Sequence, residues 1–405
     1  MEIRLPLILD GATGTQLQKL GMPSGVSTEQ WVIEHPETIT QIQQAYVEAG
    51  SNVVYACTFG ANRVKLEEYG IYNKVNEYNR RLVEISRAAV NGHAYVAGDI
   101  SPTGLFMTPM GDTPFEELVE IYTEQAKALD AAGADLFVVE TMMTVSDAKA
   151  AVLAIKSITR KPIFVTFTCD ENGKTLTGSD VSAVLLIMQG LGVDAFGLNC
   201  SNGPDKILEI IQDLSKYATI PLIAKPNAGL PHVVNNKTVY DLSPLDFVKY
   251  TDGFLAAGVG AIGGCCGSTE DHIRALSTVA SGKDYTPAGY AYADKLPAAT
   301  EKHAFMLDRD VNIGPVIPCD DNFPDSLEDA LSDNRPVIAV SLTDMAQVET
   351  LSDNQYAIDK PLCICTDDEA VLEAALRIYQ GRALYDGAIS EAVLERLARK
   401  YGVLY

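Results

Sequence analysis

The chain has 405 residues, of which 21% are charged and 47% hydrophobic, a composition typical of folded globular proteins and not of disordered ones. Its 31 basic and 54 acidic residues give a formal net charge of −23, which disfavours nucleic acid and anionic membrane surfaces as partners. No uncharged apolar run reaches the roughly 18 residues of a spanning helix, and the N-terminus has no signal-peptide pattern. These features predict a cytoplasmic protein that binds neither membranes nor nucleic acid.

Eight short apolar runs lie in the first 280 residues, and each is too short for an ordinary helix, which predicts buried strands. They are Leu5–Asp10, Asn52–Thr58, Ala94–Asp99, Leu136–Thr141, Pro162–Thr168, Ala195–Cys200, Pro221–Asn227 and Ala261–Cys266. Amphipathic stretches between them predict helices, among them Phe115–Ala131, Ser146–Ile158, Asp180–Met188 and Pro204–Leu214. Eight strand–helix units over about 280 residues favour an α/β fold of the (β/α)8 barrel type. A doubly wound open sheet is the alternative, although no G-x-G-x-x-G follows the first strand.

Local signals mark several helix ends. Thr113 is the expected N-cap of the helix Phe115–Ala131, with Pro114 at its first position and Glu116 three residues after the cap. Gly133 and Gly258 each stand between a helical stretch and the next strand, which indicates left-handed helix caps.

The composition changes after residue 285. We expect residues 1–285 to form the barrel, 286–304 a Pro-, Ala- and Tyr-rich linker, and 305–405 a small acidic α/β tail. The segment 286–405 holds 21 acidic and 10 basic residues. Two strands (Pro336–Ser341 and Pro361–Cys365) and two helices (Glu369–Tyr379 and Ile389–Tyr401) are predicted there. That is too little for a second barrel.

Chemically active side chains stand where the predicted strands end, and these ends meet on one rim of a barrel. In chain order they are Asp10, Cys57, Thr58, Asp99, Glu140, Cys169, Cys200, Asn227, Cys265 and Cys266. Only Cys200, Cys265 and Cys266 come from strands near enough to share one ion. Three thiolates with an open fourth position are typical of a catalytic zinc site. Any one strand-end cysteine is more often a core residue, but the glycines around Cys265 and Cys266 favour a metal. All eight cysteines are expected to be reduced.

The chain resembles the homocysteine S-methyltransferase family, and most closely the homocysteine-binding module of cobalamin-dependent methionine synthases. The resemblance covers about residues 1–285. Its motifs are Asp10–Thr15 (DGATGT), Asp99–Gly104 (DISPTG), Val139–Thr141 (VET), Thr175–Asp180 (TLTGSD), Gly197–Ser201 (GLNCS), Pro226–Leu230 (PNAGL) and Gly263–Thr269 (GGCCGST). The pair GLNCS and GGCCG is highly specific. The resemblance implies a zinc-dependent barrel that methylates the thiol of homocysteine to give methionine, with Cys200, Cys265 and Cys266 as zinc ligands.

The resemblance also assigns substrate contacts. Glu140 and Asp10 match the positions that hold the substrate ammonium, although each could also be structural, Asp10 by capping the turn that follows it. Backbone N–H groups near Gly11–Thr15 and Asn199–Ser201 are expected to bind the substrate carboxylate. Asn227 is a candidate for a temporary fourth zinc ligand. Thr58 and Asp99 are rim residues with either a binding or a scaffold role.

The predicted zinc site does not identify the methyl donor, since family members use a methylcorrinoid, S-methylmethionine, S-adenosylmethionine or betaine. The segment Pro361–Asp386 resembles a strand–helix–strand piece of a folate-binding barrel, but Cys365 replaces an acid and Gln380 a proline. These departures argue against bound methyltetrahydrofolate. We therefore expect methylcobalamin carried by a separate corrinoid protein, with the tail docking that protein, covering the barrel or making a homo-oligomer contact. The alternatives are an S-methylmethionine- or S-adenosylmethionine-dependent enzyme, another small thiol as acceptor, and a non-catalytic scaffold that binds homocysteine or zinc.

Overall fold

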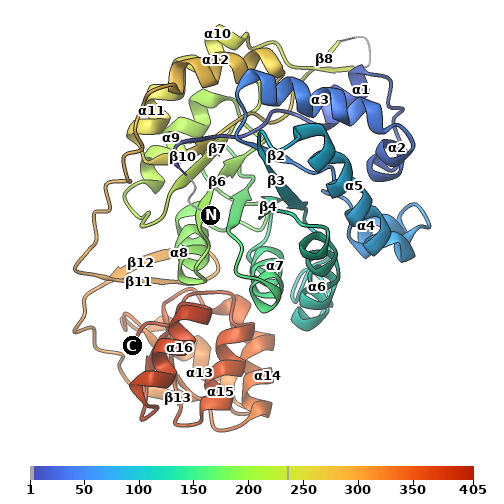
Figure 1. The fold of residues 1–405 in the computed structure, drawn as a ribbon. Coiled ribbons are helices and arrows are strands. Elements are labelled where there is room, and N and C mark those ends of the chain that lie inside the picture. The colour runs from blue at the N-terminus through green and yellow to red at the C-terminus, as the bar shows by residue number, and fades with distance from the viewer. Residues whose placement is uncertain (1–3, 235–236) are drawn as a thin grey trace.

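The computed structural model describes residues 4–234 and 237–405. Eight parallel strands form the barrel in the spatial order β1-β10-β7-β6-β5-β4-β3-β2 (Figure 1). They are β1 (Leu7–Ile8), β2 (Val53–Tyr55), β3 (Tyr95–Ile100), β4 (Leu136–Met142), β5 (Ile163–Phe167), β6 (Ala195–Asn199), β7 (Leu222–Lys225) and β10 (Val259–Ile262). This arrangement confirms the predicted (β/α)8 barrel and rules out the open doubly wound sheet.

The barrel closes between β1 and β2 through one residue. The backbone N–H of Asn52 donates to the carbonyl oxygen of Ile8 at 2.7 Å, and its side-chain Oδ1 accepts from the N–H of Ile8 at 2.8 Å. Inside, apolar side chains from all eight strands fill the space, as in other packed barrels. The barrel interior is therefore filled by side chains and forms no open channel.

Helices surround the barrel (Figure 1). They are α1 (Gly14–Lys19), α2 (Thr28–Glu34), α3 (Pro36–Ala49), α4 (Arg63–Glu67), α5 (Val75–Val90), α6 (Phe115–Ala131), α7 (Val145–Ile158), α8 (Val181–Gly190), α9 (Pro204–Leu214), α10 (Pro244–Phe247), α11 (Thr251–Ala256) and α12 (Glu270–Ala280), with 3-10 turns at Tyr72–Lys74 and Val248–Tyr250. A short hairpin, β8 (His232–Val234) and β9 (Lys237–Val239), follows β7. Within the described residues, no helix is long and apolar enough to cross a membrane.

Several predicted boundaries differ from the structure, and two of them have a clear physical reason. The last barrel strand ends at Ile262, because Gly263 and Gly264 then bring the chain against the carbonyl oxygens of Ala224 and Asp10 outside a regular ladder. The predicted cap by Thr113 is wrong: helix α6 begins at Phe115 and Pro114 is its N-cap, with no side-chain cap. Pro114 has an extended ψ of 145°, so it precedes the first turn rather than opening it. Gly133 and Gly258 do adopt positive φ values of 84° and 89°.

The C-terminal segment contains more structure than the sequence pattern indicated. Its four parallel strands have the order β13-β14-β15-β16, and a helix follows each strand. These elements are β13 (Val316–Pro318), α13 (Phe323–Ser332), β14 (Ile338–Ser341), α14 (Met345–Asn354), β15 (Leu362–Cys365), α15 (Glu369–Ile378), β16 (Leu384–Asp386) and α16 (Glu391–Tyr401), with a 3-10 turn at Gln355–Ala357. The sequence analysis missed β13 and β16, because each spans only three residues and β13 is partly exposed. It also missed the helices α13 and α14, each of ten residues.

An antiparallel hairpin joins the two parts of the chain. Strands β11 (Leu296–Ala299) and β12 (Ala304–Leu307) pair with each other and pack beside α8, so part of the segment expected as a linker is a strand. Leu296, Phe305 and Leu307 also cover the apolar face of the tail's sheet. Helices α7 and α8 face the tail (Figure 1). The tail is therefore anchored on the barrel's flank.

Candidate active site

A cavity of about 300 Å³ opens at the carboxyl ends of the barrel strands. It brings together the thiols, three acidic side chains from strand ends and the loop after β1. Its lining includes Asp10, Gly11–Thr15, Glu29, Tyr55, Cys57, Phe59, Asp99, Glu140, Thr141, Cys200, Lys225, Gly264, Cys265 and Cys266. The rim predicted from the strand ends is thus a real concave site, with residues from β1, β2, β3, β4, β6, β7 and β10 or the loops after them.

Three thiols form one cluster in this cavity. The Sγ atoms of Cys200, Cys265 and Cys266 all lie within 4.8 Å of one another, and Cys200 and Cys266 are 3.8 Å apart. This is the one group of three or more candidate metal ligands found in the described part of the chain. The other cysteines are also free thiols. The cluster therefore joins residues that are 65 and 66 positions apart in the sequence.

The backbone conformation around the three cysteines brings their thiols together. Cys200 and Ser201 adopt left-handed φ values of 61° and 55°, which residues other than glycine rarely take. Such strain is characteristic of functional sites. Gly263 allows the opposite loop to approach β1, since an added Cβ atom would lie 2.7 Å from the carbonyl oxygen of Asp10. Thus the glycines that flank Cys265 and Cys266 permit close packing next to the site.

The donor set fits a thiophilic metal ion. A tetrahedral ion with metal–sulfur bonds of about 2.3 Å places its sulfur ligands about 3.8 Å apart, which matches the Cys200–Cys266 separation. The hydrogen bond to Cys200 and burial raise the pKa of the Cys265 thiol, so three thiolates at this spacing need a compensating cation. Asn199 and Tyr240 also direct polar groups at Cys265 and Cys266, respectively, as outer groups of metal sites commonly do.

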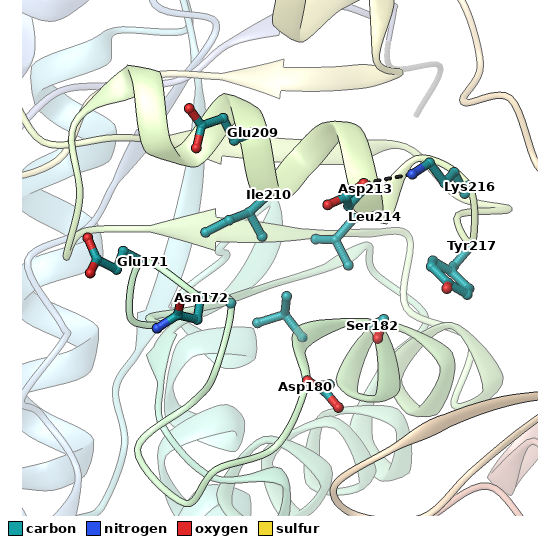
Figure 2. Close-up of a pocket in the computed structure, with 12 residues that line it drawn as sticks. Glu171, Asn172, Asp180, Ser182, Glu209, Ile210, Asp213, Leu214, Lys216 and Tyr217 are labelled. Carbon is teal, nitrogen blue, oxygen red and sulfur yellow. Dashed lines mark hydrogen bonds and ion pairs between the residues drawn. The ribbon is translucent and has the colours of Figure 1, made fainter.

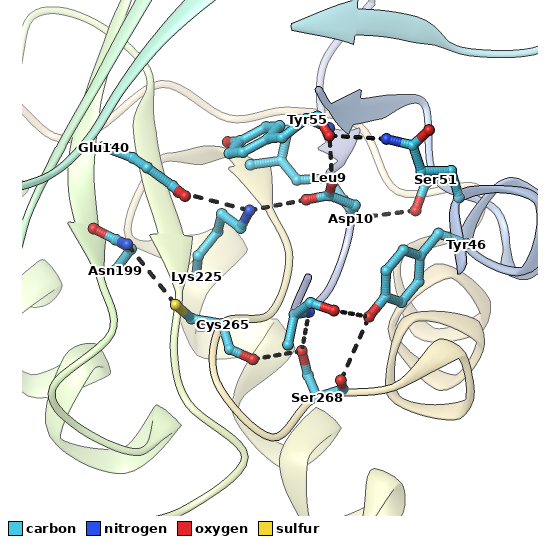
Figure 3. A network of polar contacts seen from close by, with 12 residues as sticks. Leu9, Asp10, Tyr46, Ser51, Tyr55, Glu140, Asn199, Lys225, Cys265 and Ser268 are labelled. Carbon is cyan, nitrogen blue, oxygen red and sulfur yellow. Dashed lines mark hydrogen bonds and ion pairs between the residues drawn. The ribbon is translucent and has the colours of Figure 1, made fainter. Parts of the chain in front are cut away.

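Asp10 and Lys225 form a buried ion pair beside the thiols (Figure 3). Nζ of Lys225 lies 2.9 Å from Oδ1 of Asp10 and 3.6 Å from the ring centroid of Tyr55. Oδ2 of Asp10 accepts a hydrogen bond from the backbone N–H of Tyr55 at 2.7 Å. Burial alone would lower the pKa of Lys225, but Asp10, the phenol of Tyr55 and Glu140 raise it well above its usual value. Lys225 is therefore an ammonium at neutral pH.

Asp99 and Glu140 differ from Asp10, because each has a carboxyl oxygen without a hydrogen-bond partner among the described residues. Oδ1 of Asp99 and Oε2 of Glu140 are buried, and neither has a hydrogen-bond partner among the described residues. Burial, and then the neighbouring Glu140, hold the pKa of Asp99 well above its ordinary value. Burial also raises the pKa of Glu140, while Lys225 partly counteracts the effect. Unsatisfied buried carboxyls are costly, so this part of the cavity is suited to a cationic ligand.

Four of the predicted contacts do not line the cavity. The hydroxyl of Thr58 is engaged with the backbone of Asp99, donating to its oxygen and accepting from its N–H, and so ties β2 to β3. Asn199 makes two hydrogen bonds with Thr141, and Ser201 is bonded to Thr168. Asn227 is buried, and its Oδ1 has no partner among the described residues.

The sequence interpretation missed Lys225, Tyr55, Tyr240 and Glu29. A signal for Lys225 was available, because a single lysine ends an otherwise apolar strand, Leu222–Lys225. Glu29 also carried one, since it stands three residues before the apolar Val32 and so shares its face of α2. Tyr55 and Tyr240 carried none, because aromatic residues in strands and loops are common. Their roles depend on contacts with distant parts of the chain.

The loop Gly11–Thr15 is held firmly at the cavity wall (Figure 3). The hydroxyl of Tyr46 donates to the carbonyl oxygen of Ala12 at 2.7 Å, and the N–H of Ala12 donates to Ser268 Oγ at 3.0 Å. Ser268 Oγ in turn donates to the carbonyl oxygen of Cys265 at 2.7 Å. This chain of bonds connects the loop after β1 to the thiol cluster.

Other cavities lack comparable chemistry. One of about 410 Å³ lies between the loop after β5 and α9, and its carboxylates include Glu209 and Asp213 (Figure 2). These two are paired with the exposed lysines Lys206 and Lys216. Another, of about 640 Å³, lies at the carboxyl ends of β14, β15 and β16 in the tail and carries Asp367, Asp368 and Asp386. Neither contains a buried side-chain polar atom without a partner in the described residues.

Comparison with known proteins places the barrel in a family. Residues 7–280 match the family model of homocysteine S-methyltransferases. The chain is 32% identical over 336 residues to the methionine synthase of Mycobacterium leprae, covering 76% of this chain and 28% of that protein. It is 33% identical over 289 residues to the methionine synthase of Mycobacterium tuberculosis, covering 67% of this chain and 24% of that protein. The chain thus spans about a quarter of the length of these relatives.

A solved structure agrees with the sequence comparison. The metallated form of the Escherichia coli homocysteine methyltransferase MmuM aligns with a TM-score of 0.59 and 26% identity, covering 67% of this chain and 96% of that one. The motifs around Cys200 and Cys265 lie inside residues 7–280, the region that the family model spans. The chain therefore belongs to the homocysteine S-methyltransferase family.

Proposed function

We propose that this protein transfers a methyl group to the thiol of homocysteine, giving methionine, and that Cys200, Cys265 and Cys266 hold a zinc ion for this reaction. The observation that carries the proposal is the thiol cluster, whose sulfur atoms lie within 4.8 Å of one another beside buried carboxyls. Family membership supports homocysteine as acceptor. The solved relative with a metallated form supports a metal, and three thiolates favour zinc.

A thiol has a pKa of about 8.5 and is mostly protonated at neutral pH. Zinc held by the three cysteines would favour the thiolate of the substrate and keep its sulfur nucleophilic. The cavity's acidic residues would hold the substrate ammonium, and backbone N–H groups of Gly11–Thr15 are the candidates for its carboxylate. The sulfur then attacks the methyl carbon, the donor leaves with the bonding electron pair, and the thiol proton passes to solvent.

Asn227 is our candidate for the fourth ligand in the absence of substrate. Its Oδ1 is buried and has no partner among the described residues, which is unusual for an amide oxygen. X-ray absorption at the zinc edge tests this assignment. We expect three sulfur ligands and one oxygen or nitrogen ligand in the free protein, and four sulfur ligands with homocysteine. The same fourth ligand in both states would contradict it.

We propose a methylcorrinoid carried by another protein as the donor. The resemblance to the homocysteine module of cobalamin-dependent methionine synthases supports this choice. Loops at the carboxyl end also carry exposed apolar side chains, among them Phe59, Met110 and Leu230, which suits contact with another protein. Methylation assays with methylcobalamin, S-methylmethionine and S-adenosylmethionine decide between donors. Turnover at full rate from S-methylmethionine in the absence of any corrinoid would contradict the corrinoid donor and identify S-methylmethionine as the donor.

Zinc content and homocysteine affinity test the acceptor half of the reaction. We expect one zinc per chain, and loss of both zinc and homocysteine binding in Cys265→Ala. Cys319→Ala is the matched control, because Cys319 is a buried thiol in the tail. A wild-type protein purified without chelators that holds no zinc and binds no homocysteine would contradict the proposal and favour a scaffold role.

A further inference from the structure

Asn199 ends strand β6 beside the thiol cluster, and its side chain is fully buried. Its Oδ1 accepts a hydrogen bond from the backbone N–H of Thr141 at 3.0 Å, and its Nδ2 donates to Thr141 Oγ1 at 2.7 Å. Nδ2 also points at Sγ of Cys265, 3.9 Å away (Figure 3). A backbone N–H can only donate, so the contact with Thr141 fixes the amide oxygen and leaves the amide N–H groups for Thr141 Oγ1 and the sulfur. One amide therefore bonds to strand β4 and to a thiol of the cluster.

Thr141 has a backbone conformation that needs such support. Its φ is 60°, in the left-handed region, where a β-branched residue is an outlier. The pairing of β4 with β5 shifts register between Val139 and Met142, so Glu140 and Thr141 form an irregular segment of β4. A strained conformation of this kind persists only where the surrounding contacts hold it. Asn199 supplies two of those contacts, one to the backbone and one to the side chain of Thr141.

The irregular segment shapes the cavity. In a regular strand successive side chains point to opposite faces, so Glu140 and Thr141 would not both face the interior. Both residues nevertheless line the cavity. Cys200 and Ser201, which follow Asn199, also have left-handed φ values, 61° and 55°. In the described part of the chain, four residues other than glycine have such values, and three of them are bonded to Asn199 or lie within two positions of it.

We propose that Asn199 is a positioning residue that joins the thiol cluster to the end of β4. Its amide oxygen holds the strained turn at Thr141, which keeps Glu140 and Thr141 at the cavity. Its amide N–H group donates to the Cys265 thiolate and fixes the direction of that sulfur toward zinc, as outer groups of metal sites do for their ligands. The inference rests on the proposed function and adds a residue that touches neither substrate nor metal.

Zinc affinity and a cobalt spectrum test the contact with Cys265. We expect Asn199→Ala to weaken zinc binding, measured by competition with a chromophoric chelator, by about ten-fold or more. With Co²⁺ in place of zinc, the sulfur-to-cobalt charge-transfer band should move to lower energy, because the sulfur loses a hydrogen-bond donor. Asn79→Ala is the matched control: Asn79 is equally buried, and its Nδ2 donates to the carbonyl oxygens of Ala61 and Val75 at 2.8 Å, outside the cavity lining. It should lower stability and leave the zinc affinity and the cobalt band unchanged.

Homocysteine binding by the zinc-saturated proteins tests the turn at Thr141. Asn199→Ala should weaken this binding by about ten-fold, because the strained turn is no longer held in place. Thr141→Gly removes the strain, since glycine adopts positive φ readily. In the Thr141→Gly background, Asn199→Ala should therefore cost less than about three-fold in homocysteine affinity, while its effect on zinc affinity should persist. Calorimetric titration of the wild type, both single variants and the double variant measures this coupling.

Asn199→Asp keeps the test decisive if Asn199→Ala unfolds. It is nearly isosteric and retains an acceptor for the Thr141 N–H, but it presents an oxygen to Cys265 instead of an N–H group. Zinc binding should weaken as in Asn199→Ala. Unchanged zinc affinity and an unchanged cobalt band in both Asn199 variants would overturn the inference. So would an equal loss of homocysteine affinity from Asn199→Ala in the wild-type and Thr141→Gly backgrounds. A wild-type protein that holds no zinc and binds no homocysteine would instead overturn the proposed function.

Discussion

Lys149, in barrel helix α7, donates a hydrogen bond from Nζ to the carbonyl oxygen of Leu376 in tail helix α15 at 2.9 Å. The same ammonium also donates to the carbonyl oxygen of Tyr379, so it satisfies carbonyls at the carboxyl end of α15. Lys149 is 1% exposed, and burial lowers its pKa to about 7. This contact makes the junction between barrel and tail sensitive to pH.

The stability of the wild-type protein should rise with pH, relative to Lys149→Met, between about pH 7 and pH 10. The pKa of Lys149 is about 7 in the folded protein and 10.5 as its ordinary value. Between these values the unfolded chain binds the extra proton, so unfolding becomes less favourable as the pH rises, by up to about 1.4 kcal/mol per pH unit. Urea unfolding of both proteins at pH 7, 8 and 9 measures the slope. If the free energies of unfolding of the two proteins change with pH in the same way, the lowered pKa of Lys149 is contradicted.

Gly402→Ala should destabilise the protein more than Gly133→Ala. Both glycines follow helices and have positive φ, 78° and 84°, so an alanine at either position is strained by about 1 kcal/mol. At Gly402 an added Cβ would also lie 2.7 Å from the backbone of Gly190 in α8, whereas at Gly133 it would meet nothing within 4 Å. Thermal unfolding compares the two variants. An equal loss of stability in the two variants would show that α16 and α8 can move apart without a cost in free energy.

Lys225→Met should destabilise the fold by about 3–5 kcal/mol, because it leaves the buried Asp10 carboxylate without its cation. The double variant Asp10→Asn/Lys225→Met should recover part of that loss, since it removes both charges. Denaturant unfolding of both single variants and the double variant gives the coupling energy. A double variant as unstable as the sum of the single ones would show that the pair contributes no coupling.

Chelation should lower the melting temperature of the zinc-loaded wild type and leave that of Cys265→Ala unchanged. A metal that binds only the folded chain stabilises it by mass action, and removal of the metal abolishes this stabilisation. Calorimetric scans with and without a chelator give the difference. Homocysteine binding should disappear in the same step. An equal shift in both proteins would indicate that the chelator acts elsewhere than at the cysteine cluster.

Much of the site could be predicted from the sequence because the relevant signals are local. Alternating apolar runs predicted the strands, and their ends named Asp10, Glu140, Cys200, Cys265 and Cys266, all of which line the cavity. Short elements such as β13 and β16 escaped, since three residues show no clear period. Thr58 and Asn199 could not be separated from true lining residues, because strand-end position does not reveal which hydrogen bonds a side chain already makes.

The sequence by itself determined the barrel, the three converging thiols and the family, because burial periodicity and motif residues are written along the chain. Only the tertiary structure decided which carboxyl groups already have hydrogen-bond or ion-pair partners. Asp10 is matched by Lys225, a residue 215 positions away, while Asp99 and Glu140 keep unsatisfied oxygens. The physical reason is that these pairings depend on how strands are staggered and on where side chains point across the barrel. Local sequence does not encode those distances.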